Sequence, residues 1–363
     1  MSIDKIIIYL MVVFAVLGAL DRIIGNRFGI GEKFEEGIMA IGSLAVSMVG
    51  IIALAPVIAK LLKPVVVPVF NFLGADPAMF AGTILANDMG GATLAQELAY
   101  TTDAGLFGGL IVGSMMGVTI VFTIPVALGI ISASDRKYLA TGVLAGVITI
   151  PIGSFVAGLV AGFPVMMVVK NLIPIVIIAI LIALGLWKFE GVMVKGFTLF
   201  GKFIVAVITV GLISGIVETL TGIVIIPGMN PISEGFEIVA DIAIVLAGAF
   251  PLVLVITKIF KKPLMKLGKL VGMNDVAAAG VVASLANSIP MFQMVKDMDP
   301  KGKIINFAFA VSAAFVFGDH LGFTAGFNST MIVPMIVGKL VSGVSAFVLA
   351  NFIANKTLNK ENK

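Results

Sequence analysis

The chain has 363 residues, of which 60% are hydrophobic and 12% are charged, and its mean hydropathy is +1.16. Soluble domains average roughly 45–50% apolar and about 25% charged residues, so the composition excludes an ordinary soluble protein and predicts a polytopic membrane protein. The net charge of +4 does not indicate nucleic-acid binding, because the basic residues fall in short gaps between apolar runs, as they do in cytoplasmic loops.

The residue inventory excludes several kinds of chemistry. The chain has no cysteine and a single histidine, His320, so disulfides, cysteine nucleophiles and multi-histidine metal centres are not available. The sequence contains no GxxxxGK[ST] motif, which argues against direct use of ATP. We expect no cofactor, no metal, no nucleotide and no enzymatic activity, since a membrane enzyme would have only Asp and Ser to work with.

Apolar runs of about 20 residues, each long enough for one crossing, recur along the whole chain. The first is followed directly by Asp21-Arg22 without a small-residue cleavage site, so we predict a retained helix rather than a signal peptide. The predicted crossings are 6–24, 37–60, 105–131, 138–162, 168–187, 196–217, 236–257, 303–318 and 327–354.

Two stretches outside these runs share a pattern. Residues 82–97 read GTILANDMGGATLAQE, and residues 280–293 read GVVASLANSIPMFQ. Each has Leu-Ala-Asn followed by a helix breaker, Gly90-Gly91 in the first and Pro290 in the second. We interpret 74–98 and 273–295 as re-entrant or broken helices of a duplicated protein. The alternative is that both are ordinary buried helices with polar packing residues.

The positions of Lys and Arg support a hairpin interpretation. Basic patches flank 273–295 on both sides, and if such patches are cytoplasmic this stretch begins and ends on one face. The flanks of 74–98 would both lie outside, although Lys60 and Lys63 count against this. We therefore predict one transmembrane transport domain, built as an inverted repeat of two five-element halves at 1–165 and 196–355, with a linking helix at 166–195.

The candidate substrate-binding residues lie at the hairpin tips and after the run 303–318. Asp88 is the foremost, because an intramembrane carboxylate needs a partner that a cationic substrate can provide. A structural ion pair or a helix cap is its alternative role. Asp319-His320 can hold or relay a proton, since histidine titrates near physiological pH, although a solvated helix-end pair would look the same. The remaining candidates are Asn87, Glu97, Asn287 and Ser288, of which Glu97 fits a vestibule charge equally well.

Five longer blocks resemble a known family. They are FEEGIMAIG (34–42), MFAGTILANDMGGATLAQELA (79–99), GSMMGVTIVFTIPVALGII (113–131), AGVITIPIG (145–153) and FAVSAAFVFGDHLGF (309–323). Together they resemble the ethanolamine permeases of bacterial ethanolamine-utilisation operons over essentially the whole chain. The resemblance implies a multi-pass plasma-membrane protein, with a cytoplasmic C-terminus, that admits ethanolamine to the cell. The connections around 163–170 and 219–235 are shorter than is usual in that family.

Three functions remain open at this level. The first is a transporter that facilitates the diffusion of protonated ethanolamine and is most important at low pH or low substrate concentration. Its alternative form is a secondary transporter of a small amine that is coupled to H⁺ or Na⁺. The second is a membrane enzyme, and the third is a non-transporting scaffold or sensor of ethanolamine metabolism. Lipid and ethanolamine are the expected partners, and a homodimer is the favoured oligomer.

Overall fold

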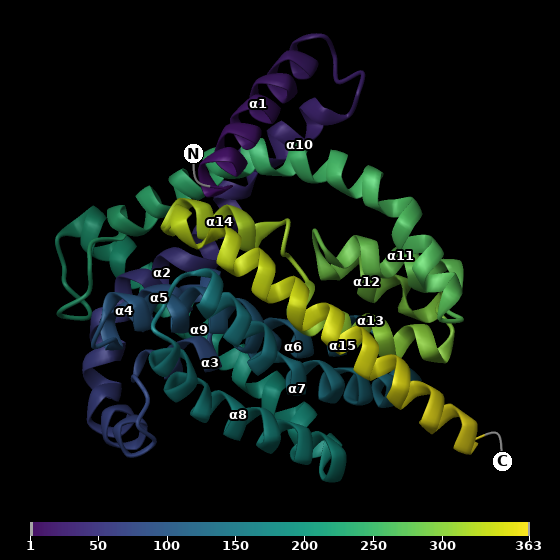
Figure 1. Cartoon of the computed structure of the whole chain (residues 1–363). Helices are drawn as coiled ribbons and strands as arrows, with labels where there is room; N and C mark the ends of the chain where they lie inside the picture. The colour runs from purple at the N-terminus through teal and green to yellow at the C-terminus, as the bar shows by residue number, and fades with distance from the viewer. Residues whose placement is uncertain (1–2, 362–363) are drawn as a thin grey trace.

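The computed structural model describes residues 3–361, which fold into helices without a strand (Figure 1). Eight helices within this range are long and apolar enough to cross a membrane. The prediction of an all-α polytopic membrane protein is therefore confirmed. The eight helices cover Ile3–Ile23, Ile30–Phe72, Thr102–Ile130, Ala133–Val160, Val165–Lys188, Gly191–Thr221, Ile232–Ile259 and Ser329–Leu358.

Two similar series of five elements follow one another along the chain. The first series consists of α1 (Ile3–Ile23), α2 (Ile30–Phe72), the broken pair α3 (Ala78–Ile84) and α4 (Ala92–Leu98), the continuous α5 (Thr102–Leu106) to α6 (Ile124–Ile130), and α7 (Arg136–Val160). After α8 (Val165–Lys188), the second consists of α9 (Glu190–Thr221), α10 (Ile232–Leu270), the pair α11 (Asp275–Ser284) and α12 (Ser288–Met294), the pair α13 (Pro300–Ala313) and α14 (Asp319–Phe327), and α15 (Ile332–Glu361).

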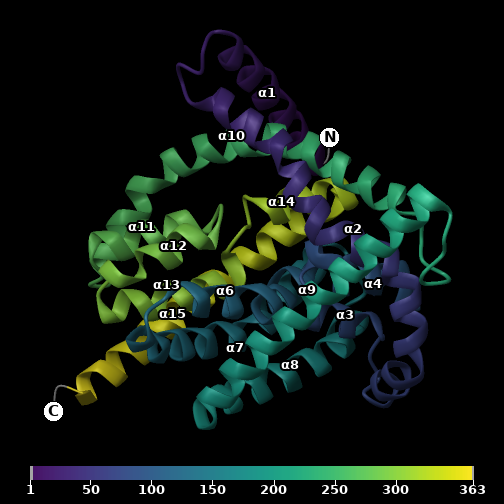
Figure 2. The ribbon, with the colours of Figure 1, turned by 180° about the vertical axis from the view of Figure 1, so that it is seen from behind.

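The packing between the two series is reciprocal. Helix α1 of the first series packs on α10 of the second, and α9 of the second packs on α2 of the first (Figures 1 and 2). Both contacts are close at a glycine, since a Cβ at Gly248 would lie 2.2 Å from the Met11 carbonyl oxygen and one at Gly50 would lie 1.9 Å from that of Ile208. Such reciprocity is expected of a duplicated bundle, while the opposite membrane orientation of the two halves stays a prediction.

The stretch 74–98 is broken at its tip, as the sequence predicted. Between α3 and α4 the segment Asn87–Gly91 contains two residues with non-helical backbone angles, Met89 and Gly90. Gly90 has a φ of 84°, a conformation that a glycine adopts without steric cost. The helix therefore stops and restarts at the position that carries Asp88.

Both ends of this stretch meet at its base. The Asp76 carboxylate accepts hydrogen bonds from the backbone N–H of Ala78, at 2.9 Å, and of Tyr100, at 3.0 Å. Burial raises the pKa of the Asp76 carboxyl above its usual value, although these backbone hydrogen bonds act in the opposite direction. Because Asp76 and Tyr100 stand before α3 and after α4, the chain leaves this element where it entered.

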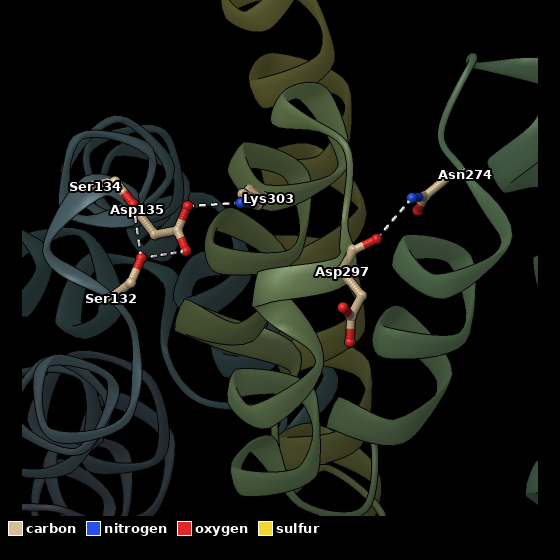
Figure 3. A network of polar contacts seen from close by, with 6 residues as sticks. All are labelled: Ser132, Ser134, Asp135, Asn274, Asp297 and Lys303. Atoms are coloured by element: carbon tan, nitrogen blue, oxygen red, sulfur yellow. Dashed lines mark hydrogen bonds and ion pairs between the residues drawn. The ribbon is translucent and has the colours of Figure 1, made fainter.

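The stretch 273–295 closes in the same way. The Asn274 side chain donates to the Asp297 carbonyl oxygen at 2.9 Å (Figure 3). Its backbone N–H donates to the Asp299 carboxylate at 2.8 Å. These contacts join the start of α11 to the chain that follows α12. Both stretches thus have the hairpin geometry that a re-entrant segment requires.

The predicted crossing at 303–318 was wrong as a continuous helix. Helix α13 ends at Ala313, and α14 begins at Asp319. Between them, the N–H groups of Phe315 and Phe317 donate to the carbonyl oxygens of Ser284 and Leu285, at 3.0 and 2.9 Å. These hydrogen bonds run to the neighbouring hairpin tip instead of along the helix, and Phe315 has a φ of 64°. The broken helix therefore places the start of α14 beside the α11–α12 tip.

An ion pair joins α13 to the start of α7 (Figure 3). Lys303 Nζ lies 2.6 Å from a carboxylate oxygen of Asp135, and the two side chains are 12% and 6% exposed. The Ser132 hydroxyl donates to the second Asp135 oxygen at 2.8 Å. A buried carboxylate with this set of partners is compensated, so the contact fixes the two halves to each other at the base of the second hairpin.

Candidate functional site

A cavity of about 240 Å³ lies where the two broken elements face α2. Its floor and walls come from α2, the tip of the first hairpin, the α5–α6 helix, the α11–α12 tip and the start of α14. The lining residues are Ser43, Leu44, Ser47, Met48, Asp88, Met89, Val118, Phe122, Asn287, Ile289, Phe315, Asp319 and His320. Four of the seven sequence-predicted residues therefore meet here: Asp88, Asn287, Asp319 and His320.

Asp88 faces this cavity from the kink between α3 and α4. Its side chain is 18% exposed, and its Oδ1 atom lies 3.9 Å from Nε2 of His320. That separation is longer than a hydrogen bond, so the contact is electrostatic. Asp88 consequently keeps an accessible carboxylate surface while a polar group stands behind it.

His320 is connected on its other side to Lys339, which sequence reasoning missed. Lys339 lies on α15 with no exposed surface, and its Nζ atom is 3.1 Å from Nδ1 of His320. The same ammonium donates to the carbonyl oxygen of Ser114. A protonated Lys339 can only donate, and with this partner Nδ1 of His320 accepts and the ring proton is assigned to Nε2, which faces Asp88.

This arrangement changes the role expected for His320. Its side chain is 1% exposed, and protonation would place a second positive charge beside the Lys339 ammonium in a buried site. A neutral imidazole is therefore favoured. We expect His320 to act as a polar link between Lys339 and Asp88, in place of the proton carrier suggested by the sequence.

Lys339 had a sequence signal that could have revealed it. It is the one charged residue in the sequence of the run 327–354. An ionisable side chain inside a membrane span is by default a functional candidate. Its partners could not have been inferred, because α15 and α14 are placed by the break after α13.

Asp319 lies at the other side of the cavity, at the first position of α14. Within residues 3–361 its carboxylate accepts no hydrogen bond and forms no ion pair, and the charged groups that act on it are the carboxylates of Asp88 and Glu36. Asn287 stands next to it at the hairpin tip, where its Oδ1 atom caps α12 by accepting from the Ile289 N–H at 2.8 Å.

The other three predicted residues do not line this cavity. Asn87 and Ser288 are fully buried, and neither the Asn87 amide nor the Ser288 hydroxyl has a hydrogen-bond partner in the described chain. Glu97 is exposed on α4 and does not line the cavity that contains Asp88. Asn87 and Ser288 therefore belong to the interior of the hairpin tips in this conformation, and Glu97 belongs to the surface.

Two phenylalanines complete the site. The Phe315 ring lies edge-on to Phe122 with centroids 5.5 Å apart, and 5.2 Å from the His320 ring. Both phenylalanines line the cavity, and an aromatic face attracts an ammonium ion. The cavity thus combines carboxylates and aromatic faces for a cation with hydroxyl and amide groups for a hydrogen-bonding substituent.

Among residues 3–361 no group of His, Asp and Glu side chains could hold a metal ion.

Comparisons with known proteins identify the family. The model of the family described as "Ethanolamine utilisation protein, EutH" matches residues 3–353. A Listeria monocytogenes protein named "Probable ethanolamine permease EutH" is 69% identical over 361 residues, 99% of this chain and 96% of that protein. The protein of the same name from Escherichia coli is 51% identical, with 98% and 97% covered, and the Bacillus subtilis protein YxeR is 49% identical, with 100% and 98% covered. No solved structure matches. The chain belongs to the EutH ethanolamine utilisation family.

Proposed function

We propose that this protein admits protonated ethanolamine to the cell by facilitated diffusion through a site formed by Asp88 and the start of α14. The family and the eight apolar helices support a membrane transporter. The name of the Listeria relative supports ethanolamine as the solute.

The observation that carries the proposal is the composition of the 240 Å³ cavity. An ethanolammonium ion has a positive charge at one end and a hydroxyl group at the other, and entry into the protein removes the hydration of both. Asp88 and Asp319 replace water at the ammonium, and the Phe315 ring adds a face for the cation. Ser43, Ser47 and Asn287 offer partners for the hydroxyl.

The membrane potential alone can drive the accumulation of protonated ethanolamine, as facilitated diffusion requires. A negative membrane potential draws a monovalent cation inward with about 2.3 kcal/mol per 100 mV, so neither ATP nor a coupling ion is required. Consumption by enzymes inside the cell keeps the gradient inward. The neutral free base crosses lipid unaided, and the advantage given by the protein is therefore largest in acid and at limiting substrate.

Uptake of labelled ethanolamine into vesicles containing the pure protein tests the proposal. Asp88→Asn should reduce the rate at limiting substrate by at least about tenfold, because the ammonium loses a countercharge at close range. Glu97→Gln removes an exposed carboxylate of the same hairpin and serves as the control. Near-normal uptake by Asp88→Asn, at equal protein content, would assign Asp88 a structural role.

The same vesicles separate facilitated diffusion from ion coupling. Uptake should follow an imposed potential, persist without Na⁺, and show an advantage over protein-free vesicles that shrinks as the pH rises. Uptake that stops when Na⁺ or a proton gradient is removed would establish the coupled alternative. Vesicles that admit no solute would favour a scaffold or sensor.

A further inference from the structure

A second cavity, of about 220 Å³, adjoins the one that contains Asp88. Asn287 and Asp319 line both cavities, so these two side chains form the partition between them. The other lining residues of the second cavity are Lys33, Glu36, Phe250, Val253, Leu254, Thr257, Ala286 and Gly318. The second cavity is therefore enclosed by α2, α10, the α11–α12 tip and the start of α14.

Successive turns of helix α2 line the second cavity and then the first. Glu36 lies in the second cavity, and Ser43 and Ser47 lie in the first. Residues seven apart on an α-helix lie close to one face, so Glu36 and Ser43 follow one line along α2. The FEEG block at 34–37, to which the Asp88 site gave no role, thus places one carboxylate on this line.

The two glutamates of that block have different surroundings. Glu35 pairs with Arg22, with Nε and Oε2 3.2 Å apart, and lines neither cavity. Glu36 forms an ion pair with Lys33 inside the second cavity. The Glu36 side chain is 54% exposed and that of Lys33 38%, so both remain accessible to solvent and to a solute.

Asp319 provides an independent indication of a ligand. It faces both cavities without a hydrogen bond or ion pair in the described chain, and its charged neighbours are the carboxylates of Glu36 and Asp88. A carboxylate that has two carboxylate neighbours and no counterion attracts a cation, because the cation relieves their mutual repulsion. Lys33 is already paired with Glu36, which leaves the cation to come from outside.

We propose that Glu36 and Asp319 form a second subsite for an organic ammonium ion, from which the ion passes Asn287 to reach Asp88. Lys33 competes with the incoming cation for Glu36 and so restricts entry. Only the identity of the ammonium ion as ethanolamine rests on the proposed function. The cation subsite in the second cavity is inferred from the positions of Glu36, Asp319 and Lys33 alone.

The chain lacks cysteine, and this allows the charge of the cavity to be measured without any transport. A cysteine introduced by Thr257→Cys lies in the second cavity. Its reaction rate is compared for two methanethiosulfonate reagents, one with a trimethylammonium group and one with a sulfonate, on the full-length protein in detergent. The ratio of the cationic to the anionic rate reports the local potential.

Glu36→Gln and Lys33→Met, each added to Thr257→Cys, should change the ratio of the cationic to the anionic rate in opposite directions. Glu36→Gln should lower the ratio by about 3- to 10-fold at low salt, and the difference should shrink at high salt through screening. Lys33→Met should raise the ratio by a similar factor. Glu35→Gln is the matched control, since it neutralises the adjacent carboxylate that faces Arg22, and it should leave the ratio within about twofold.

Protection by ethanolamine separates the two proposals. Ethanolamine at neutral to mildly alkaline pH, where it is still an ammonium ion and the carboxylates are ionised, should slow the modification of Thr257→Cys. Glu36→Gln should weaken this protection, while ethylene glycol should protect neither variant. A ratio that responds equally to Glu36→Gln and Glu35→Gln overturns the second subsite. A ratio that depends on Glu36 with no protection by ethanolamine leaves the cation subsite standing and counts against ethanolamine as its ligand.

Discussion

Replacement of Lys339 by methionine tests the electrostatic core of the site. The path from the Lys339 ammonium to the Asp88 carboxylate consists of 3.1 Å to Nδ1 of His320, the width of the imidazole ring, and 3.9 Å from Nε2 to Oδ1. With a ring width of about 2.2 Å, the two charges are at most about 9 Å apart. At an effective dielectric constant of about 20, this separation corresponds to about 2 kcal/mol.

The sign of the effect follows from the charge that is lost. The Lys339 charge favours the ionised form of Asp88, so its removal should leave more of Asp88 protonated at neutral pH and weaken the attraction of Asp88 for a cation. The dissociation constant of ethanolamine at neutral pH should rise, by up to roughly 20- to 30-fold, which is the free-energy difference expressed as a ratio. The loss of affinity should shrink as the pH rises, because Asp88 then ionises without Lys339.

The assay is equilibrium binding of labelled ethanolamine to purified protein, together with uptake into vesicles. Leu340→Met, at the neighbouring position of α15, controls for a change of side-chain shape in this helix. An unchanged dissociation constant in a folded Lys339→Met protein would refute the electrostatic coupling of Lys339 to Asp88. A tighter affinity would show instead that Lys339 acts mainly by repelling the substrate cation.

Two further predictions concern the frame around the site. Cysteines introduced at Asn71 and Thr102, exposed positions that flank the first hairpin, should react with an impermeant reagent from the same membrane face, and labelling from opposite faces would exclude a re-entrant hairpin. Lys303→Met leaves the Asp135 carboxylate buried without its cation and should lower stability by about 3–5 kcal/mol, measured as thermal unfolding in detergent. Part of this loss should return when Asp135→Asn is added, and additive losses would contradict the pairing.

The breaks at the hairpin tips could be predicted because their causes are local. Gly90-Gly91 permits the turn at Asp88, and Asn287 with Pro290 marks the second tip. A repeated Leu-Ala-Asn then suggested that the two tips work together. Polar residues in an apolar chain are informative, because each of them is costly in lipid.

The break after α13 could not be predicted for the opposite reason. The letters VSAAFVF at 311–317 show no glycine or proline, and they read as the end of an apolar helix. The break depends on hydrogen bonds from Phe315 and Phe317 to the α11–α12 tip, which exist only in the folded protein. The positions of His320 and Lys339 depend on this break, so the Asp88–His320–Lys339 alignment was equally out of reach of the sequence.

The charges of the two cavities set the number of cations that the protein can hold. With all groups ionised, Glu36, Asp88 and Asp319 carry three negative charges. Lys33 in the second cavity and Lys339 behind His320 carry two positive charges, which leaves one negative charge. One ethanolammonium neutralises it, and a second would add an uncompensated positive charge close to the first. The tip of the second hairpin adds no further negative charge, since Ser288 occupies the position that corresponds to Asp88 in the first half. Equilibrium binding should therefore saturate at one ethanolamine per chain, with the ion exchanging between the two subsites, and a measured value of two would show that the subsites fill independently.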